Sequence, residues 1–434
     1  MDIARHALKW DRLGPVLIIL LTCGCDRDPS PTQAPTAEPV VDIPLNPGAA
    51  AATETTWQTG AQQIQMCADN NRVLRQAISD FLANPSEEGL QQSRSQWRQA
   101  HNHFIATSLF LSLAENNPGL FGSLAQYQYA LDGHPIQPGF IDYFDVYQHS
   151  GIVNDIAITL SAESLRQQHG ITDVSDVSIG FHAMEYLLWG ETGTRPVDDF
   201  TAVNQVSAEQ QQQGLRVVDL PNNRRRVYLQ LLAEMLFDDC NRLYSAWTDP
   251  SANLAPQYQA LQIPSRLSLW RAIVAAELHA LHSELVSAEA AQDSESNQDS
   301  ETEPLSANHN LFAKQNAGVI AGRLSGLQAV LFGPSREKEA EQDAAKDADE
   351  DTDTTLKLAV ILFDPAFADT LAAEFNAAMD EVSKLDSLPT QAPWLTSLSE
   401  QLLAALTHLN PNALPDPAID GGDSNETDPA EASR

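Results

Sequence analysis

A histidine and a glutamate one helical turn apart are the residues of this chain best suited to chemistry. They are His182 and Glu185, which follow Gly180 in a Gly-x-His-x-x-Glu pattern. Residues three apart on a helix have Cβ atoms about 5–6 Å apart, so an imidazole and a carboxylate can reach one cation. Iron and zinc both accept that pair of ligands. The spacing therefore predicts a metal site whose remaining ligands come from elsewhere in the chain.

The elements that must position this pair are helical. Apolar residues recur at helical spacing from about residue 56 to residue 410, and the alternation typical of strands is sustained nowhere. The segment Thr248-Asp249-Pro250-Ser251 interrupts the pattern. We therefore predict an all-α fold of two packed helical bundles, one over residues 56–250 that carries the motif and one over residues 251–410.

The N-terminus has the pattern of an export signal. Basic residues precede a short apolar run, and a small-residue zone follows that ends at Cys25. The run is shorter than the roughly 20 residues that span a bilayer. We predict a lipoprotein-type signal peptide over residues 1–25 with Cys25 as the lipidated residue; Cys23 and a plain cleaved signal are the alternatives. Residues 26–55, rich in Pro, Ala and Thr, would then be a disordered tether that holds a periplasmic domain at a membrane of the cell envelope.

The formal charge of −34 is concentrated in segments with little apolar content. We predict disordered acidic inserts near residues 287–307 and 335–354 and a disordered acidic tail over residues 411–434. A nucleic acid is not expected as a partner, because binding phosphates requires clustered Lys and Arg.

Two cysteines remain beyond the signal, Cys67 and Cys240. An exported protein sits in an oxidising compartment, so we predict a disulfide between them. Because both lie in apolar helical stretches, buried free thiols are the alternative.

The motif and its surroundings resemble the imelysin family of bacterial envelope proteins. The resemblance covers most of residues 56–410 and is carried by residues 180–190, by Gly139-Phe140-Ile141-Asp142-Tyr143 and by Arg224-Arg225-Arg226-Val227-Tyr228-Leu229. It implies two helical bundles with a site at their interface, an exported or lipid-anchored location and an association with iron uptake. It also implies that His182 and Glu185 are the metal-motif positions and that Asp142 is a recurring acidic position before them.

The chain departs from the family pattern in two places. Many relatives carry an arginine and a glutamate on the helix after the tryptophan that matches Trp97, and here those positions are His101 and Thr107. His101 would supply a nitrogen, whereas Thr107 removes a carboxylate. Relatives also often show Phe-Ser-Asp-Asn-Thr in the second half, where this chain has Leu311 to Asn316, including Lys314-Gln315-Asn316.

These observations favour an exported, lipid-anchored protein that binds a metal ion or assists iron uptake together with other envelope proteins. The expected metal ligands are His182, Glu185, Asp142 and His101, with iron as the favoured metal and zinc as the alternative. A metallopeptidase-like enzyme is the second hypothesis, although the His-Glu-x-x-His pattern of zinc peptidases is absent. A scaffold that has lost its metal site is the third. No nucleophile elbow or phosphate-binding glycine loop occurs.

Overall fold

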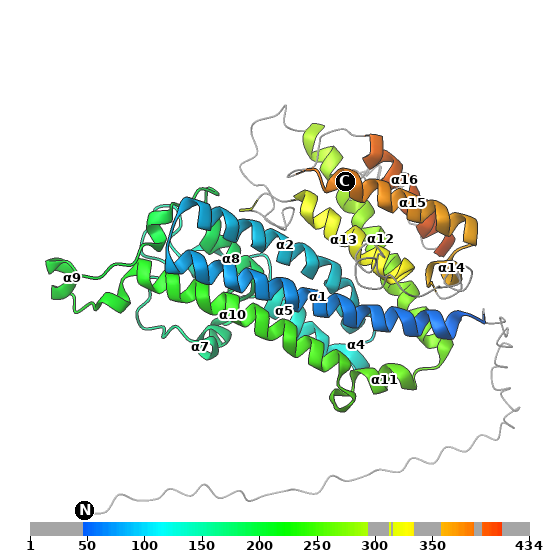
Figure 1. Cartoon of the computed structure of the whole chain (residues 1–434), viewed down its shortest axis with the longest axis horizontal. Coiled ribbons are helices and arrows are strands. Elements are labelled where there is room, and N and C mark those ends of the chain that lie inside the picture. Colours follow the sequence, from blue (N-terminus) through cyan, green and yellow to red (C-terminus); the bar gives the residue numbers. More distant parts are fainter. Residues whose placement is uncertain (1–46, 294–311, 314–315, 334–356, 386–392, 410–434) are drawn as a thin grey trace, which may run out of the picture. The chain divides into compact units, whose positions relative to one another are not determined.

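The computed structural model describes residues 47–293, 312–313, 316–333, 357–385 and 393–409 (Figure 1). Most of these residues are in helices, and the one β-type pairing among them is an isolated bridge between Phe144 and Tyr147. The predicted all-α class is therefore confirmed. None of the described helices combines the length and apolar character needed to cross a bilayer.

Three long helices form the core of the first half. They are α1 (Ala49–Ala83), α2 (Glu87–Leu111) and α10 (Pro221–Thr248), and α1 packs along both of the others (Figure 1). Local signals set their starts. Ser86 caps α2 by accepting a hydrogen bond from the Gly89 amide at 3.1 Å, and Pro221 occupies the first turn of α10.

Two shorter helices, α5 (Ala125–Asp132) and α8 (Gly180–Trp189), each contact both α2 and α10. The motif helix α8 contacts α2, α5 and α10, and every one of its side chains is buried. Such a helix depends on its neighbours for stability rather than on its own propensity. The other short helices of this half are α3 (Leu113–Asn116), α4 (Pro118–Phe121), α6 (Pro138–Ile141), α7 (Ala162–Gln168) and α9 (Ala208–Gln212), and α9 buries none of its residues.

The second half packs against the first chiefly through α13 (Asn316–Phe332), which lies along α2. Two glycines make this approach close. A Cβ atom at Gly322 would lie 2.7 Å from the Cβ of Ile105, and one at Gly326 would lie 2.9 Å from the Ala106 carbonyl oxygen. The remaining helices are α11 (Leu254–Ala260), α12 (Ile263–Asp293), α14 (Ala359–Leu362), α15 (Pro365–Val382) and α16 (Pro393–Leu409).

The expected segment boundaries differ from the structure at two points. The tether was expected to reach residue 55, but α1 begins at Ala49; the first acidic insert was expected from residue 287, but α12 continues to Asp293. Alanine and glutamate are strong helix formers, and they extend both helices into sequence that has little apolar periodicity.

Several other predictions fall outside the described residues. These are the signal peptide with Cys23 and Cys25, most of the tether, the insert at 335–354 and the tail at 411–434. The expected division near residue 250 coincides with a short 3-10 helix at Pro250–Ala252, while the described residues from Pro47 onward belong to one compact unit. The division into two domains stays a prediction.

Cys67 and Cys240 lie side by side where α1 meets α10. Both are fully buried free thiols, with their sulfur atoms 2.8 Å apart, and the Asn71 amide donates to the Cys240 sulfur at 3.3 Å. The two cysteines are neighbours, as the prediction requires. The predicted disulfide itself is corrected, because both are free thiols whose sulfur atoms share a hydrogen-bond network.

The close contact between α13 and α2 gives a test of the packing. Gly322→Ala should lower the free energy of unfolding by about 1–2 kcal/mol, because overpacking costs roughly 1–3 kcal/mol and better helix propensity returns at most about 1. Gly122→Ala is the control, since a Cβ there meets nothing within 4 Å. Urea unfolding of both variants makes the measurement, and equal stabilities would contradict the described packing.

Candidate metal centre

Three buried side chains from three different helices converge beside the motif. They are His101 on α2, Asp132 at the end of α5 and His182 on α8, and one ligand atom from each lies within 4.8 Å of the others. All three are at most 2% exposed. Among the described residues this is the group of His, Cys, Asp and Glu side chains that could hold a metal ion.

One carboxylate oxygen joins the two imidazoles. Asp132 Oδ1 lies 2.8 Å from His101 Nε2 and 3.2 Å from His182 Nε2. An ion bonded at about 2.0–2.2 Å holds neighbouring ligand atoms about 3.0–3.5 Å apart. The two oxygen-to-nitrogen distances are therefore near the spacing that a metal ion requires, and two nitrogens with one oxygen suit iron or zinc.

Glu185 contacts the cluster through the second ring nitrogen of His182. Its Oε2 atom is 2.9 Å from His182 Nδ1, and its Oε1 atom accepts hydrogen bonds from the amides of Phe312 and Ala313 at 3.0 and 2.8 Å. A carboxylate on the far nitrogen of a ligating histidine fixes the ring and its tautomer. Glu185, expected among the ligands, thus contacts His182 and the backbone and is not one of the three residues of the cluster.

The leading glycine of the motif explains how α8 reaches α5. Gly180 has φ +89°, and a Cβ atom there would lie 2.6 Å from the Leu131 carbonyl oxygen and 2.8 Å from that of Ala130. Only glycine adopts this conformation without strain and leaves room for the neighbouring backbone. Gly180 therefore lets the start of α8 press against the end of α5, where Asp132 is carried.

Aromatic packing holds His101 in place. Its ring stacks on Trp97, with centroids 4.7 Å apart, and Trp97 Nε1 donates to the Phe181 carbonyl at 2.9 Å. The tryptophan therefore connects α2 to α8 and fixes the distance between the two histidines of the cluster.

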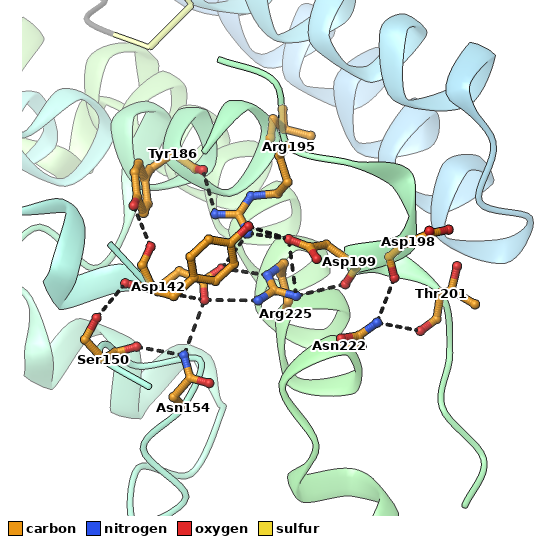
Figure 2. Close-up of polar contacts among 12 residues, drawn as sticks. Asp142, Ser150, Asn154, Tyr186, Arg195, Asp198, Asp199, Thr201, Asn222 and Arg225 are labelled. Atoms are coloured by element: carbon orange, nitrogen blue, oxygen red, sulfur yellow. Dashed lines mark hydrogen bonds and ion pairs between the residues drawn. The ribbon is translucent and has the colours of Figure 1, made fainter. Parts of the chain in front are cut away.

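Asp142, expected among the ligands, lies instead in a buried ion-pair network (Figure 2). Arg225 Nε and Arg195 Nη1 approach its Oδ2 atom at 2.6 and 3.0 Å, and Arg195 also pairs with Asp199 at 2.9 Å. Two guanidinium groups compensate the Asp142 charge, so this position would repel a cation. Tyr186 of α8 donates to the Tyr143 carbonyl at 2.7 Å, which ties the motif helix to this network.

The remaining expected positions are Thr107 and residues 314–316, where the chain departs from the family pattern. The Thr107 hydroxyl donates to the carbonyls of His103 and Gln63 at 2.8 and 3.2 Å, so it serves packing between α1 and α2. Lys314 and Gln315 lie outside the described residues, and Asn316 begins α13.

Asp132 is the member of the cluster that the sequence did not reveal. It precedes Gly133 and His134 in a stretch that reads as a loop, and no spacing rule connects it to His182. The one local signal is an acid followed by Gly-His-Pro, which is compatible with an ordinary turn.

The two carboxylates make His182 an unusually strong base. Burial alone would lower its pKa, but the hydrogen bonds and charges of Asp132 and Glu185 outweigh that and raise the pKa to about 10. Without a metal ion, these contacts therefore favour the protonated form of His182, whose two ring nitrogens face Asp132 and Glu185. A metal ion at Nε2 would have to displace a proton there, so its binding would become more favourable as pH rises.

This raised pKa predicts a pH dependence of stability in chelator-treated protein. The stabilisation should be fully present below the unfolded-state pKa of about 6.5 and be lost as pH rises towards about 10. The measurement is the unfolding free energy of wild type minus that of His182→Gln across this range. A difference that does not change with pH would contradict the charged network.

Comparison with known proteins agrees with this fold and motif. Among curated proteins, none matches the chain. A crystal structure named as a "putative iron-regulated protein A precursor" from Parabacteroides distasonis has a similar fold, with a TM-score of 0.55 and 14% identity over 85% of this chain and 95% of that one. The family model described as imelysin, peptidase M75, matches residues 62–410. The chain therefore belongs to the imelysin family.

Proposed function

We propose that this protein binds a metal ion at the cluster of His101, Asp132 and His182, with Glu185 orienting His182. The convergence of three buried donor atoms within 4.8 Å supports this most directly. Leaving such ionisable groups in the interior is costly unless they are paired or hold a cation. A cation bonded to Asp132 and to two neutral imidazoles would satisfy all three groups together.

Iron is the favoured metal. Two histidines and one carboxylate with open positions are the donor set of many non-haem iron sites, and zinc accepts the same set. The similar structure from Parabacteroides distasonis is named as an iron-regulated protein. That name describes the other protein, and it supports iron as the metal proposed here. We therefore place the protein in iron binding or in an accessory step of iron uptake, with zinc as the alternative.

A peptidase role is less well supported by the geometry. A metallopeptidase needs a general base beside a metal-bound water. Glu185 would be the base, but its two oxygens contact His182 and the amides of Phe312 and Ala313. Held in this way, Glu185 orients the histidine and does not face an attacking water.

We also propose that the domain is lipid-anchored in the cell envelope through Cys25, with Cys23 as the alternative. The basic, apolar and small-residue order of the first 25 residues supports this. An anchored domain would hold its metal site close to the membrane and to other envelope proteins that handle the ion.

The metal site can be tested by titrating the purified domain with Fe²⁺ under anaerobic conditions and with Zn²⁺. His101→Ala and Asp132→Asn should each weaken binding by on the order of 100-fold or more, and Glu185→Gln by about 10- to 100-fold, the usual loss when a group that orients a ligand is removed. His279→Ala, an exposed histidine on α12, is the matched control. Circular dichroism melts establish that each variant is folded. Affinities equal to that of the control would rule out the site.

The anchor is tested separately by labelling cells with an alkyne fatty acid. Wild-type protein should incorporate the label and remain with membranes, because the lipid would be the attachment. Cys25→Ala should lose both properties and Cys23→Ala should keep them. Label retained by Cys25→Ala but lost by Cys23→Ala would move the anchor to Cys23, and no label in the wild type would contradict lipidation.

A further inference from the structure

A surface pocket lies next to the candidate metal centre and shares Asp132 with it. Its volume is about 390 Å³, and it is bounded by residues of the first half and by α12 and α13 of the second. Its lining includes Tyr129, Asp132, Gly133, His134, Glu277 and Arg323. Asp132 thus belongs both to the metal cluster and to the pocket wall.

His134 lines the pocket and lies beside His182 of the cluster. It is exposed, and its ring centroid lies 5.4 Å from that of His182, which is nearly the 5.3 Å between His101 and His182. Two imidazoles bonded to one ion at about 2.1 Å in tetrahedral geometry have centroids about 5 Å apart. His134 therefore lies as far from His182 as a second ligating histidine would.

The tautomer of His134 suits a ligand. Its Nδ1 atom is 2.8 Å from the Asp132 carbonyl oxygen, and because a carbonyl can only accept, Nδ1 carries the proton. In a neutral ring, Nε2 is then the nitrogen that could bind an ion. Ligating histidines commonly donate their other nitrogen to a backbone carbonyl in this way.

We propose that this pocket is the entrance for the metal ion and that His134 is an additional ligand that captures the ion at the inner end. The proposal rests on the function proposed above. The ligand atoms of His134 do not belong to the three-residue group. To bind the ion, the exposed ring of His134 therefore has to turn towards it. A fourth donor on the solvent side would close the site after the ion has passed.

The charge of the pocket wall favours cations. Glu277 faces the pocket, and the one arginine that lines it, Arg323, is held by Glu277 at 3.0 Å and by Glu284 at 3.3 Å. The one arginine of the wall is thus matched by two carboxylates, and Asp132 adds a further acidic side chain to the pocket. A recess with excess negative charge concentrates cations and speeds their association.

The test measures binding of Fe²⁺ and Zn²⁺ to the full domain by stopped-flow and equilibrium titration. His134→Ala should lower affinity by about tenfold or more, and free imidazole should restore part of it, because a missing ligand can be supplied from solution. Glu277→Gln should slow association by a few-fold at low salt and less at high salt, since steering is screened by ions.

His149→Ala, another exposed histidine, is the control. Binding by His134→Ala that equals this control, or an affinity loss that imidazole leaves unchanged, would overturn the role of His134. An unchanged association rate in Glu277→Gln would overturn the entrance. Absence of binding by the wild type would instead contradict the proposed function itself.

Discussion

The site depends on burying a chain of four ionisable groups that runs from Glu185 through His182 and Asp132 to His101. In a low-dielectric interior each group is costly by itself, and the arrangement is tolerated because every neighbour is of opposite charge or can donate a hydrogen bond. The same arrangement leaves Asp132 between two imidazole nitrogens. A cation bound at that point would replace the shared protons as the partner of Asp132 and of the two imidazoles, and the backbone would not have to move.

The surrounding helices hold these four side chains at contact distance from one another. Gly180 lets α8 approach α5, and Trp97 connects His101 to α8. The amides of Phe312 and Ala313 hold Glu185 from the second half of the protein. Ala313 lies only three positions before Asn316, the first residue of α13, so the chain that holds Glu185 is close in sequence to the helix that packs on α2.

The local features of this molecule could be predicted from sequence, and the convergent ones could not. Helical periodicity is a local property, so the all-α class followed from it, as did the proximity of His182 and Glu185. Whether Asp132 or Asp142 joins the two histidines depends on which of them the folded chain places beside arginines. Asp142 meets two of them and Asp132 meets two histidines, and no spacing rule distinguishes these positions. The role of Glu185 likewise depends on backbone amides distant in the chain.

Anomalous diffraction at the iron absorption edge, from crystals grown with Fe²⁺ under anaerobic conditions, tests the central claim most directly. One strong peak is expected about 2.0–2.2 Å from His101 Nε2, Asp132 Oδ1 and His182 Nε2, with Glu185 still on His182 Nδ1. A peak at Asp142, or none within bonding distance of the three donors, would contradict it.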